Sequence, residues 1–367
     1  MAASRALCLA LLAAVWLAGC GAAAGGSPTA TPIPPPVPTR TPATAHTPIP
    51  VSLATRLAAG QLPPGAPART STGDELLAVF AEAGLGAAGL PLRQIAAVAV
   101  TADGELWLAT GGSEPRLLRF DGSAWREETA SPLPAQVLAR GPDGALWAAA
   151  GCDAARYSAG RWELAAPCGQ NTGRAHAIDF GPQGSVWLTT DFALHRIDTQ
   201  GRRAFDGFYP LRAAITPDGA AWVTRSPLDP ADPGLVAIDP SGATRDVTSQ
   251  LQLQNPLALA AAPDGTLWVG GTGGAASFDG RTWRVYPIDG RAAELRVHEL
   301  AVAPDGDLWA ISGDAPVGSG LARFDGDRWE LHDPGAAAVG GLTFAPDGSL
   351  WLTTEAGVVH LRPAQRR

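Results

Sequence analysis

Short hydrophobic runs alternate with turn-forming residues along most of the chain. The run IAAVAV at Ile95–Val100 precedes a turn, and the run LWLAT at Leu106–Thr110 follows it. Similar pairs recur from residue 90 to residue 367. Short runs that are apolar or alternating, and that are bounded by Gly, Pro and Asp, are typical of β-strands joined by tight turns. We therefore expect an all-β fold made of hairpins.

The turn between the paired runs belongs to a motif of the form x-P-D-G-x-L-W, which occurs seven times. Pro presets φ, Asp bonds its own backbone and Gly supplies a positive φ, so the motif predicts a tight turn. The copies are TADGELW, GPDGALW, GPQGSVW, TPDGAAW, APDGTLW, APDGDLW and APDGSLW, with turn glycines at positions 104, 144, 184, 219, 265, 306 and 348. The spacing of 35 to 46 residues is that of a four-stranded propeller blade. The sequence therefore predicts a seven-bladed β-propeller of four-stranded blades over residues 90–367.

A second motif follows the first and marks the turn between the third and fourth strands of a blade. It is clearest as RFDGSAW (Arg119–Trp125) and RFDGDRW (Arg323–Trp329). Of the twelve Trp residues, seven lie in the first motif, four lie in the second, and Trp16 lies in the N-terminal segment. We expect the eleven motif tryptophans to pack between adjacent blades, which leaves no Trp for a sugar-stacking platform.

Together, the two motifs resemble the two-component regulator propeller repeats of bacterial sensor ectodomains. The DG-x-L-W half also resembles streptogramin B lyases. The resemblance covers Leu90 to Leu361 and implies the propeller fold. It leaves the function open, because propellers host many functions.

The seventh blade lacks a fourth strand in the sequence, because only polar residues follow VVHL (Val358–Leu361). Residues 51–89 are expected to complete the ring. The segment VSLATRL (Val51–Leu57) has the alternation of a closing outer strand. The segment DELLAVFAEA (Asp74–Ala83) predicts a short amphipathic helix that begins near Thr72 or Asp74.

The N-terminus has the features of a targeting segment. Arg5 precedes the apolar stretch Leu7–Leu17, and LAGC at residues 17–20 resembles a bacterial lipobox. This resemblance implies a signal peptide over residues 1–19, lipidation of Cys20 and attachment to the membrane. The alternative is an ordinary secretory signal with an accidental Cys. Residues 20–50 follow as a Pro/Thr-rich linker, which we expect to form an extended stalk.

Charge and cysteine content narrow the class further. The 27 basic residues are all Arg, the net charge is −8, and a basic face for nucleic acid is not expected. In an exported protein, Cys152 and Cys168 predict a disulfide, with two buried thiols as the alternative. We expect a monomer located outside the cytoplasm.

Candidate ligand-binding residues lie where the innermost strands begin. Residues eight positions before the turn glycines include Gln136, His176 and His298, which are expected to surround one mouth of the central channel. Nearby polar residues complete the candidate set: Arg174, Arg212, Asn255 and Arg296. Loops from all blades converge at such a mouth. A merely solvated rim is the alternative.

No nucleophile motif, zinc spacing or phosphate loop is present, and we predict no cofactor or metal site. The sequence favours a surface-anchored binding or scaffold propeller for a protein, peptide or glycan, such as a sensor-type ectodomain. The alternative is a rim-active lyase or lactonase. Resemblance to streptogramin lyases would then assign catalytic roles to His298 and Glu294 beside a magnesium ion.

Overall fold

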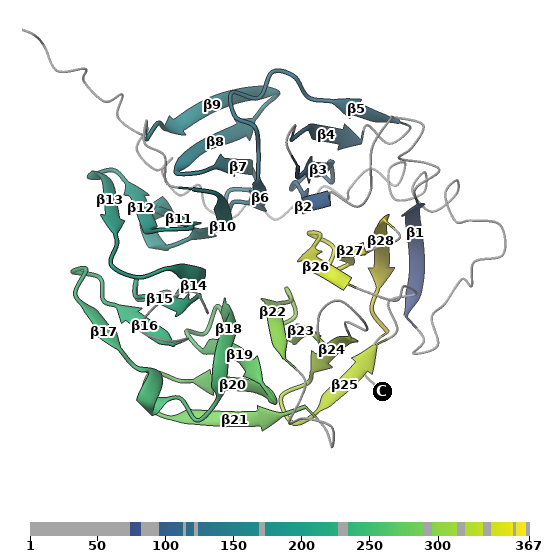
Figure 1. Cartoon of the computed structure of the whole chain (residues 1–367). Helices are drawn as coiled ribbons and strands as arrows, with labels where there is room; N and C mark the ends of the chain where they lie inside the picture. Colours follow the sequence, from purple (N-terminus) through teal and green to yellow (C-terminus); the bar gives the residue numbers. More distant parts are fainter. Residues whose placement is uncertain are drawn as a thin grey trace, which may run out of the picture. The chain divides into compact units, whose positions relative to one another are not determined.

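A computed structural model of the chain contains seven four-stranded antiparallel sheets arranged around a central channel (Figure 1). It describes residues 74–81, 95–112, 115–120, 124–168, 173–226, 234–288, 296–313, 320–332, 339–354 and 357–364. The predicted seven-bladed propeller is therefore confirmed. The signal peptide, Cys20 and the Pro/Thr-rich linker lie outside the described residues.

Six blades use four strands that are consecutive in sequence, with the first strand beside the channel and the fourth outside. The strands of blades one to three are β2 (Ile95–Val100), β3 (Leu106–Thr110), β4 (Leu117–Phe120), β5 (Trp125–Glu127); β6 (Val137–Arg140), β7 (Leu146–Ala150), β8 (Asp153–Ser158), β9 (Arg161–Ala166); and β10 (Ala175–Phe180), β11 (Val186–Thr190), β12 (Leu194–Asp198), β13 (Gly201–Phe205). Those of blades four to six are β14 (Pro210–Ile215), β15 (Ala221–Arg225), β16 (Leu235–Ile238), β17 (Thr244–Asp246); β18 (Gln254–Ala261), β19 (Leu267–Thr272), β20 (Gly274–Phe278), β21 (Trp283–Pro287); and β22 (Val297–Val302), β23 (Leu308–Ser312), β24 (Gly320–Phe324), β25 (Trp329–His332).

The seventh blade combines the two ends of the described chain. It is made of β26 (Val339–Phe344), β27 (Leu350–Thr354), β28 (Gly357–Arg362) and, outermost, β1 (Glu75–Ala81). β1 pairs antiparallel with β28, from Glu75 opposite Arg362 to Ala81 opposite Gly357. The N-terminal strand thus closes the ring and covers an edge that would otherwise be open.

This closure corrects two predictions. The helix expected over Asp74–Ala83 is wrong, because Glu75–Ala81 is a strand. The predicted closing strand Val51–Leu57 lies outside the described residues, and the place assigned to it beside β28 is occupied by β1. The local helical pattern is overridden because the unpaired edge of β28 offers β1 a full set of backbone hydrogen bonds.

A buried polar cluster holds the start of β1 in place. The Asp74 carboxylate contacts Nδ1 of His332 at 2.8 Å and accepts a hydrogen bond from the Ala364 backbone N–H, also at 2.8 Å. Arg323 donates to the Ala364 carbonyl and pairs with Asp307, whose side chain is also buried. The cluster therefore joins blade six to the two chain segments that meet in blade seven, the start of β1 and the residues after β28.

The connections of the blades form two faces of the ring. The turn face carries the hairpins between first and second strands and between third and fourth strands. The mouth face carries the remaining connections, within and between blades. On the turn face, the N–H of six motif glycines, beginning with Gly104, donates to the carbonyl three residues earlier. These glycines have φ between 79° and 93°, which side chains other than Gly rarely adopt.

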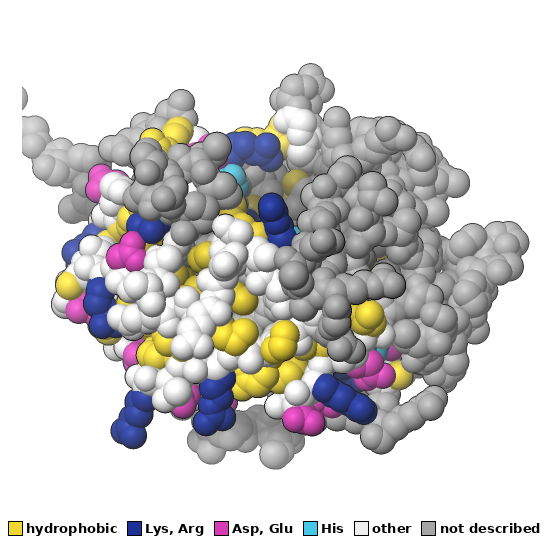
Figure 2. All heavy atoms as spheres, turned by 60° about the horizontal axis from the view of Figure 1, so that its bottom comes forward, with side chains coloured by type: hydrophobic (Ala, Val, Ile, Leu, Met, Phe, Trp, Pro, Cys, Tyr) yellow, Lys and Arg dark blue, Asp and Glu magenta, His cyan; other side chains and the backbone are white. Residues whose placement is uncertain are grey.

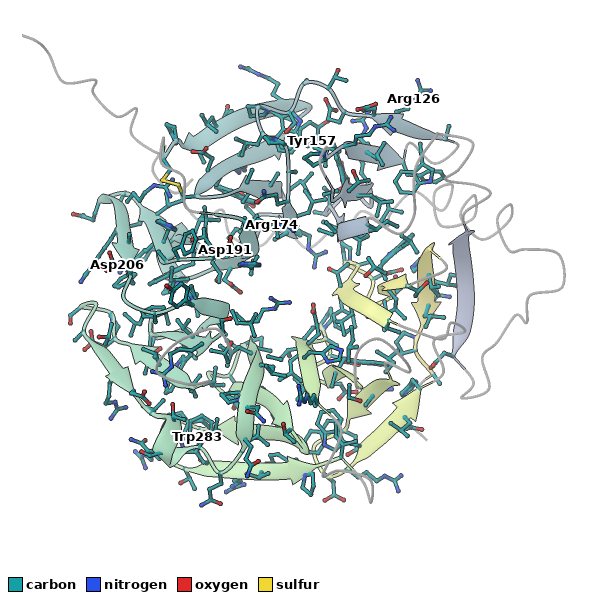
Figure 3. All side chains as sticks on the ribbon, viewed as in Figure 1. Arg126, Tyr157, Arg174, Asp191, Asp206 and Trp283 are labelled. Carbon is teal, nitrogen blue, oxygen red and sulfur yellow. A yellow bond between two sulfur atoms is a disulfide. The ribbon has the colours of Figure 1, made fainter. Side chains whose placement is uncertain are left out.

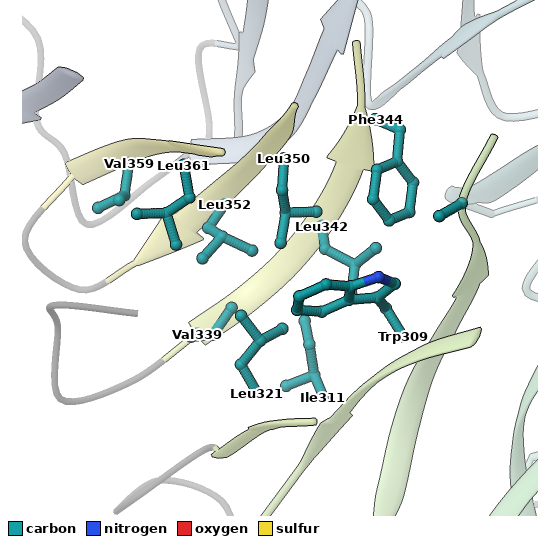
Figure 4. Close-up of a cluster of buried hydrophobic side chains, with 11 residues drawn as sticks. Trp309, Ile311, Leu321, Val339, Leu342, Phe344, Leu350, Leu352, Val359 and Leu361 are labelled. Atoms are coloured by element: carbon teal, nitrogen blue, oxygen red, sulfur yellow. The ribbon is translucent and has the colours of Figure 1, made fainter. Parts of the chain in front are cut away.

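The core consists of seven hydrophobic clusters, each shared by two neighbouring blades. All eleven motif tryptophans belong to them, which confirms their predicted role. In one cluster, Trp309 and Leu321 of blade six pack against Leu342 and Phe344 of blade seven (Figure 4). Trp309 is only 2% exposed. Blade-to-blade packing of this kind is what stabilises the ring.

The predicted disulfide between Cys152 and Cys168 is confirmed, with the two Cα atoms 5.7 Å apart (Figure 3). Cys152 follows β7 and Cys168 follows β9, so the bond joins two connections on the mouth face of blade two. Disulfides persist in oxidising compartments, and this one indicates a location outside the cytoplasm. In the described part of the chain, no helix could cross a membrane.

The outer wall carries charges of both signs. Figure 2 shows the side of the ring that lies at the bottom of Figure 1, where Arg and acidic side chains are interspersed and several Arg project at the lower edge. On this side, the described residues therefore present no single sign of charge.

Candidate functional site

The innermost strands share a local irregularity where they reach the mouth face. In six of the seven blades, the register between the first and second strands shifts at this point. The shift lies between Ala175 and Ala177 in blade three, between Val297 and Glu299 in blade six, and between Val339 and Gly341 in blade seven. His176 and His298 occupy the extra position in blades three and six. Such β-bulges redirect side chains and are frequent beside functional sites. The bulges therefore explain why the rim side chains depart from the regular alternation of the strands.

Below the rim, the central channel has a volume of about 770 Å³. Small side chains such as Ala97, Ala177, Ala258 and Gly341 line much of it. The charged or titratable residues along it come from four blades: Arg140, His176, Asp179, Arg212 and Glu299. Most of the lining residues are thus apolar, and a few charged groups lie among them, a combination that is common in ligand sites.

Arg212 is the centre of the charged groups in the channel. Its Nη2 atom lies 3.9 Å from Oε2 of Glu299, which is on blade six, two blades away. Burial raises the pKa of Glu299, while Arg212 and a hydrogen bond from the Leu342 backbone act in the opposite direction. The ion pair therefore links blade four to blade six along the channel wall.

Asp179 is a second carboxyl near Arg212. Burial raises its pKa to about 7, even though the positive charge of Arg212 lowers it. Its Oδ2 atom has no exposed surface and no hydrogen-bond partner, although the residue as a whole is half-buried. A carboxyl in this state can take up or release a proton near neutral pH.

At the rim of blade three, His176 is held by a carboxylate that the sequence did not identify. Nε2 of His176 lies 2.6 Å from Oδ1 of Asp191, and the Arg174 backbone N–H donates to Oδ2 of Asp191 at 2.7 Å. Both hydrogen bonds lower the pKa of Asp191, against the effect of burial. Asp191 follows the second strand of its blade, a connection whose residues follow no repeated pattern, so the motifs gave no signal for it.

The other predicted rim residues are more constrained than expected. Oε1 of Gln136 accepts hydrogen bonds from the N–H groups of Gly151 and Ala175, so this side chain joins blade two to blade three. Asn255 has a φ of 48° and donates to Oγ1 of Thr272. These contacts give both residues a structural role in the rim.

On the opposite side, Arg296 is exposed and directly precedes β22. Burial lowers the pKa of His298, and a hydrogen bond with the Arg296 backbone raises it in part. His298 does not line the channel described above. Glu294, its partner in the lyase alternative, lies outside the described residues. Among the described residues, no group of three or more His, Cys, Asp or Glu side chains is arranged to hold a metal ion.

Comparison with known proteins identifies relatives in structure alone. No family model matches the chain, and no curated protein does. A streptogramin B lyase matches with a TM-score of 0.59 and 18% identity, over 74% of this chain and 94% of that one. The virginiamycin B lyase of Staphylococcus aureus gives a TM-score of 0.59 and 19% identity, over 75% and 96% of the two chains.

An extracellular domain of a two-component system and a protein solved with a bound peptide also match, with slightly lower scores. The extracellular domain of the hybrid two-component system BT3049 of B. thetaiotaomicron has a TM-score of 0.57 and 13% identity, over 75% of this chain and 39% of that one. YCF48, in a structure bound to D1 peptide, has a TM-score of 0.55 and 16% identity, over 75% and 93%. At these identities the matches establish a shared fold and carry no statement about function.

Proposed function

We propose that this protein is an exported binding propeller that holds its ligand at the channel opening of the mouth face. The observation that supports this most directly is the collection of unlike polar groups there. Arg212, Glu299 and the His176–Asp191 pair come from three different blades and surround a channel of about 770 Å³. A binding site needs such variety, which the repeated hairpins of the turn face do not offer.

The structural neighbours are compatible with this role. One neighbour is a sensor-type extracellular domain, and another was solved with a bound peptide. The architecture is therefore compatible with a protein or peptide ligand. The mixed charges of the channel would orient such a ligand, while the apolar side chains of its wall would pack against it.

We further propose that the propeller is held at the membrane surface through a lipid on Cys20. The lipobox-like LAGC and the Pro/Thr tract after it support this, since the tract would extend ~3.1 Å per residue as a stalk. Metabolic labelling with a palmitate analogue tests the anchor. Label should be incorporated into the wild-type chain, and persistence of that label in Cys20→Ser would contradict the proposal.

The binding role is tested with the whole mature chain, secreted under an ordinary signal peptide in place of residues 1–20. A glycan array and a phage-displayed peptide library supply ligands, whose affinity is then measured for two variants. Arg212→Ala removes the central charge of the channel. Arg281→Ala removes an exposed Arg from a hairpin of the turn face and serves as the matched control.

We expect Arg212→Ala to weaken binding at least tenfold and Arg281→Ala to leave it within twofold. Ligands that are insensitive to Arg212→Ala but lost in Arg281→Ala would place the site on the turn face and overturn the proposal. A folded wild-type chain that selects no ligand from either library would also count against it.

A further inference from the structure

Two exposed aromatic side chains contact each other on the mouth face. Phe192 is 53% exposed and Tyr209 is 39% exposed, and their ring centroids lie 6.2 Å apart at an interplanar angle of 73°. Among the described residues, the other large hydrophobic side chains with comparable exposure are aliphatic. Exposed aromatic pairs leave apolar surface in contact with water, which is unfavourable, and they are enriched where proteins bind partners.

The pair lies beside the groups already assigned to the rim. Phe192 directly follows Asp191 in the connection between β11 and β12, and Tyr209 directly precedes β14 of blade four. In Figure 3, Arg174, Asp191 and Asp206 follow one another from the channel outward along blade three. The aromatic pair thus spans the junction of blades three and four, next to the opening of the channel.

Arginine side chains gather around this opening beside carboxyls that differ in burial. Among the described residues of the rim and channel, Arg140, Arg174, Arg212 and Arg296 lie with Asp179, Asp191 and Glu299, and the exposed Asp206 lies further out at the junction of blades three and four. Burial raises the pKa of Asp179 to about 7 and also raises the pKa of Glu299, which favours the neutral form of both carboxyls. In a chain with a net charge of −8, this local excess of Arg favours a ligand with a negative group.

The geometry favours a peptide over a sugar. The two rings are inclined at 73°, so together they present an edge and a face to a ligand, whereas a sugar usually stacks flat on one ring face. Both oxygens of Asp191 already accept hydrogen bonds, from His176 and from the Arg174 backbone, so this carboxylate is engaged within the rim. Arg174, by contrast, has an exposed side chain that can bind a carboxylate through two parallel hydrogen bonds.

We propose that Phe192, Tyr209 and Arg174 form a subsite for a peptide segment in which a large apolar side chain stands close to a carboxylate. The inference deepens the binding role proposed above and rests on it. The apolar side chain would pack against the exposed surface of the two rings, and the Arg174 guanidinium would bind the acidic group. The rest of the peptide would run toward the channel and Arg212.

The experiment uses a phage-displayed library of random twelve-residue peptides selected on the mature chain. Synthetic copies of the selected peptides are then titrated by fluorescence anisotropy. We expect the peptides to share a large apolar residue within a few positions of Asp or Glu. Phe192→Ser and Tyr209→Ser should each weaken binding at least tenfold. Leu331→Ser, which removes a side chain 61% exposed on β25, is the matched control and should stay within twofold.

The role of Arg174 is tested by combining one substitution in the protein with one substitution in the peptide. Arg174→Gln should weaken binding of an acidic peptide about tenfold and leave binding of its Asp→Asn or Glu→Gln copy unchanged. Equal losses for both peptides would contradict the contact between Arg174 and a carboxylate. Circular dichroism of each variant confirms that it is folded.

The outcomes separate this subsite from the general binding role. If Arg212→Ala abolishes binding while Phe192→Ser and Tyr209→Ser leave it unchanged, the subsite is wrong and the channel-mouth role stands. If all three variants bind like the wild type, both proposals fail. Selection of glycans and of no peptide would overturn the peptide assignment.

Discussion

The turn face and the mouth face of the ring differ in how far the blades repeat one another. On the turn face, Asp143, Asp218, Asp264, Asp305 and Asp347 each accept a hydrogen bond from the backbone N–H two residues later. On the mouth face, the position eight residues before the turn glycine differs between blades. It is His in blades three and six, Leu in blades four and five, and Gly in blade seven. The turn-face groups satisfy one another, whereas the mouth-face groups differ from blade to blade.

This difference separates stability from recognition. The repeated hairpins and the tryptophans beside them set the register and pack neighbouring blades together. Residues that depart from the repeat gather around the channel and need not be the same in each blade. The comparison predicts that substitutions in the repeated elements destabilise the ring, while substitutions of exposed rim side chains such as Arg174 and Phe192 leave the free energy of unfolding almost unchanged.

The largest effect is expected for Trp309→Ala. This side chain is 2% exposed and packs between blades six and seven, so its loss should lower the free energy of unfolding by ~3–5 kcal/mol. Urea denaturation measures the loss. Trp283→Ala, at the half-buried position of the second motif, is the control and should cost less (Figure 3). Equal losses at the two positions would contradict the link between burial and stability.

The disulfide should have the next largest effect, and it lies on the mouth face. Replacing both Cys152 and Cys168 by Ser removes a link across 16 residues, which should cost ~3 kcal/mol. In thermal unfolding, reductant should lower the melting temperature of the wild-type chain by as much as the double substitution does. Reductant should not change the melting temperature of the double variant. An unchanged melting temperature would mean that the connections of blade two are already fixed by packing alone.

A pH-dependent effect on the order of 2 kcal/mol is expected from Asp179. Its pKa of about 7 in the folded protein exceeds the value of ~3.9 for an unfolded Asp. Between these values the unfolded chain has lost a proton that the folded chain keeps, so stability contributed by this group falls as the pH rises. Asp179→Asn should therefore stabilise the protein at pH 8 and have almost no effect near pH 4. Denaturation at both pH values decides this, and an equal change at both would contradict it.

The smallest effect is expected for Arg174→Ala and Phe192→Ser. Both side chains are exposed, so the free energy of unfolding should change by less than ~0.5 kcal/mol. Thermal unfolding is the measurement. A loss comparable with that of Trp309→Ala would show that the rim also stabilises the ring and would remove the distinction between the two faces.

The repeat motifs predicted what they directly encode. Seven Pro-Asp-Gly-type turns gave the number of blades, and the order of strands gave the pairing of Cys152 with Cys168. The closing strand could not be found in this way. ELLAVFA at Glu75–Ala81 has helix-forming residues at helical spacing, and only its distant partner β28 makes it a strand. A single local pattern contains no information about that partner.

The site was predicted less completely, for a related reason. His176 and Arg212 were found because they occupy a fixed distance from the turn glycines or lie next to it. Asp191, Phe192 and Tyr209 lie in connections that follow no repeat, and the junction of blades three and four brings them together. The two repeat motifs account for every Trp except Trp16, so Trp carries no signal for the site. Phe and Tyr outside the motifs were the available signal.

The bulges at the start of the innermost strands bear on how such a protein can diversify. In six blades the register shifts at the rim and is regular below it, so the strand beneath is aligned independently of the residues above. A duplicated blade could therefore gain, lose or exchange residues on the mouth face while its hairpin and its tryptophans stay in place. Selection could then change the ligand in one blade at a time without selecting again for folding.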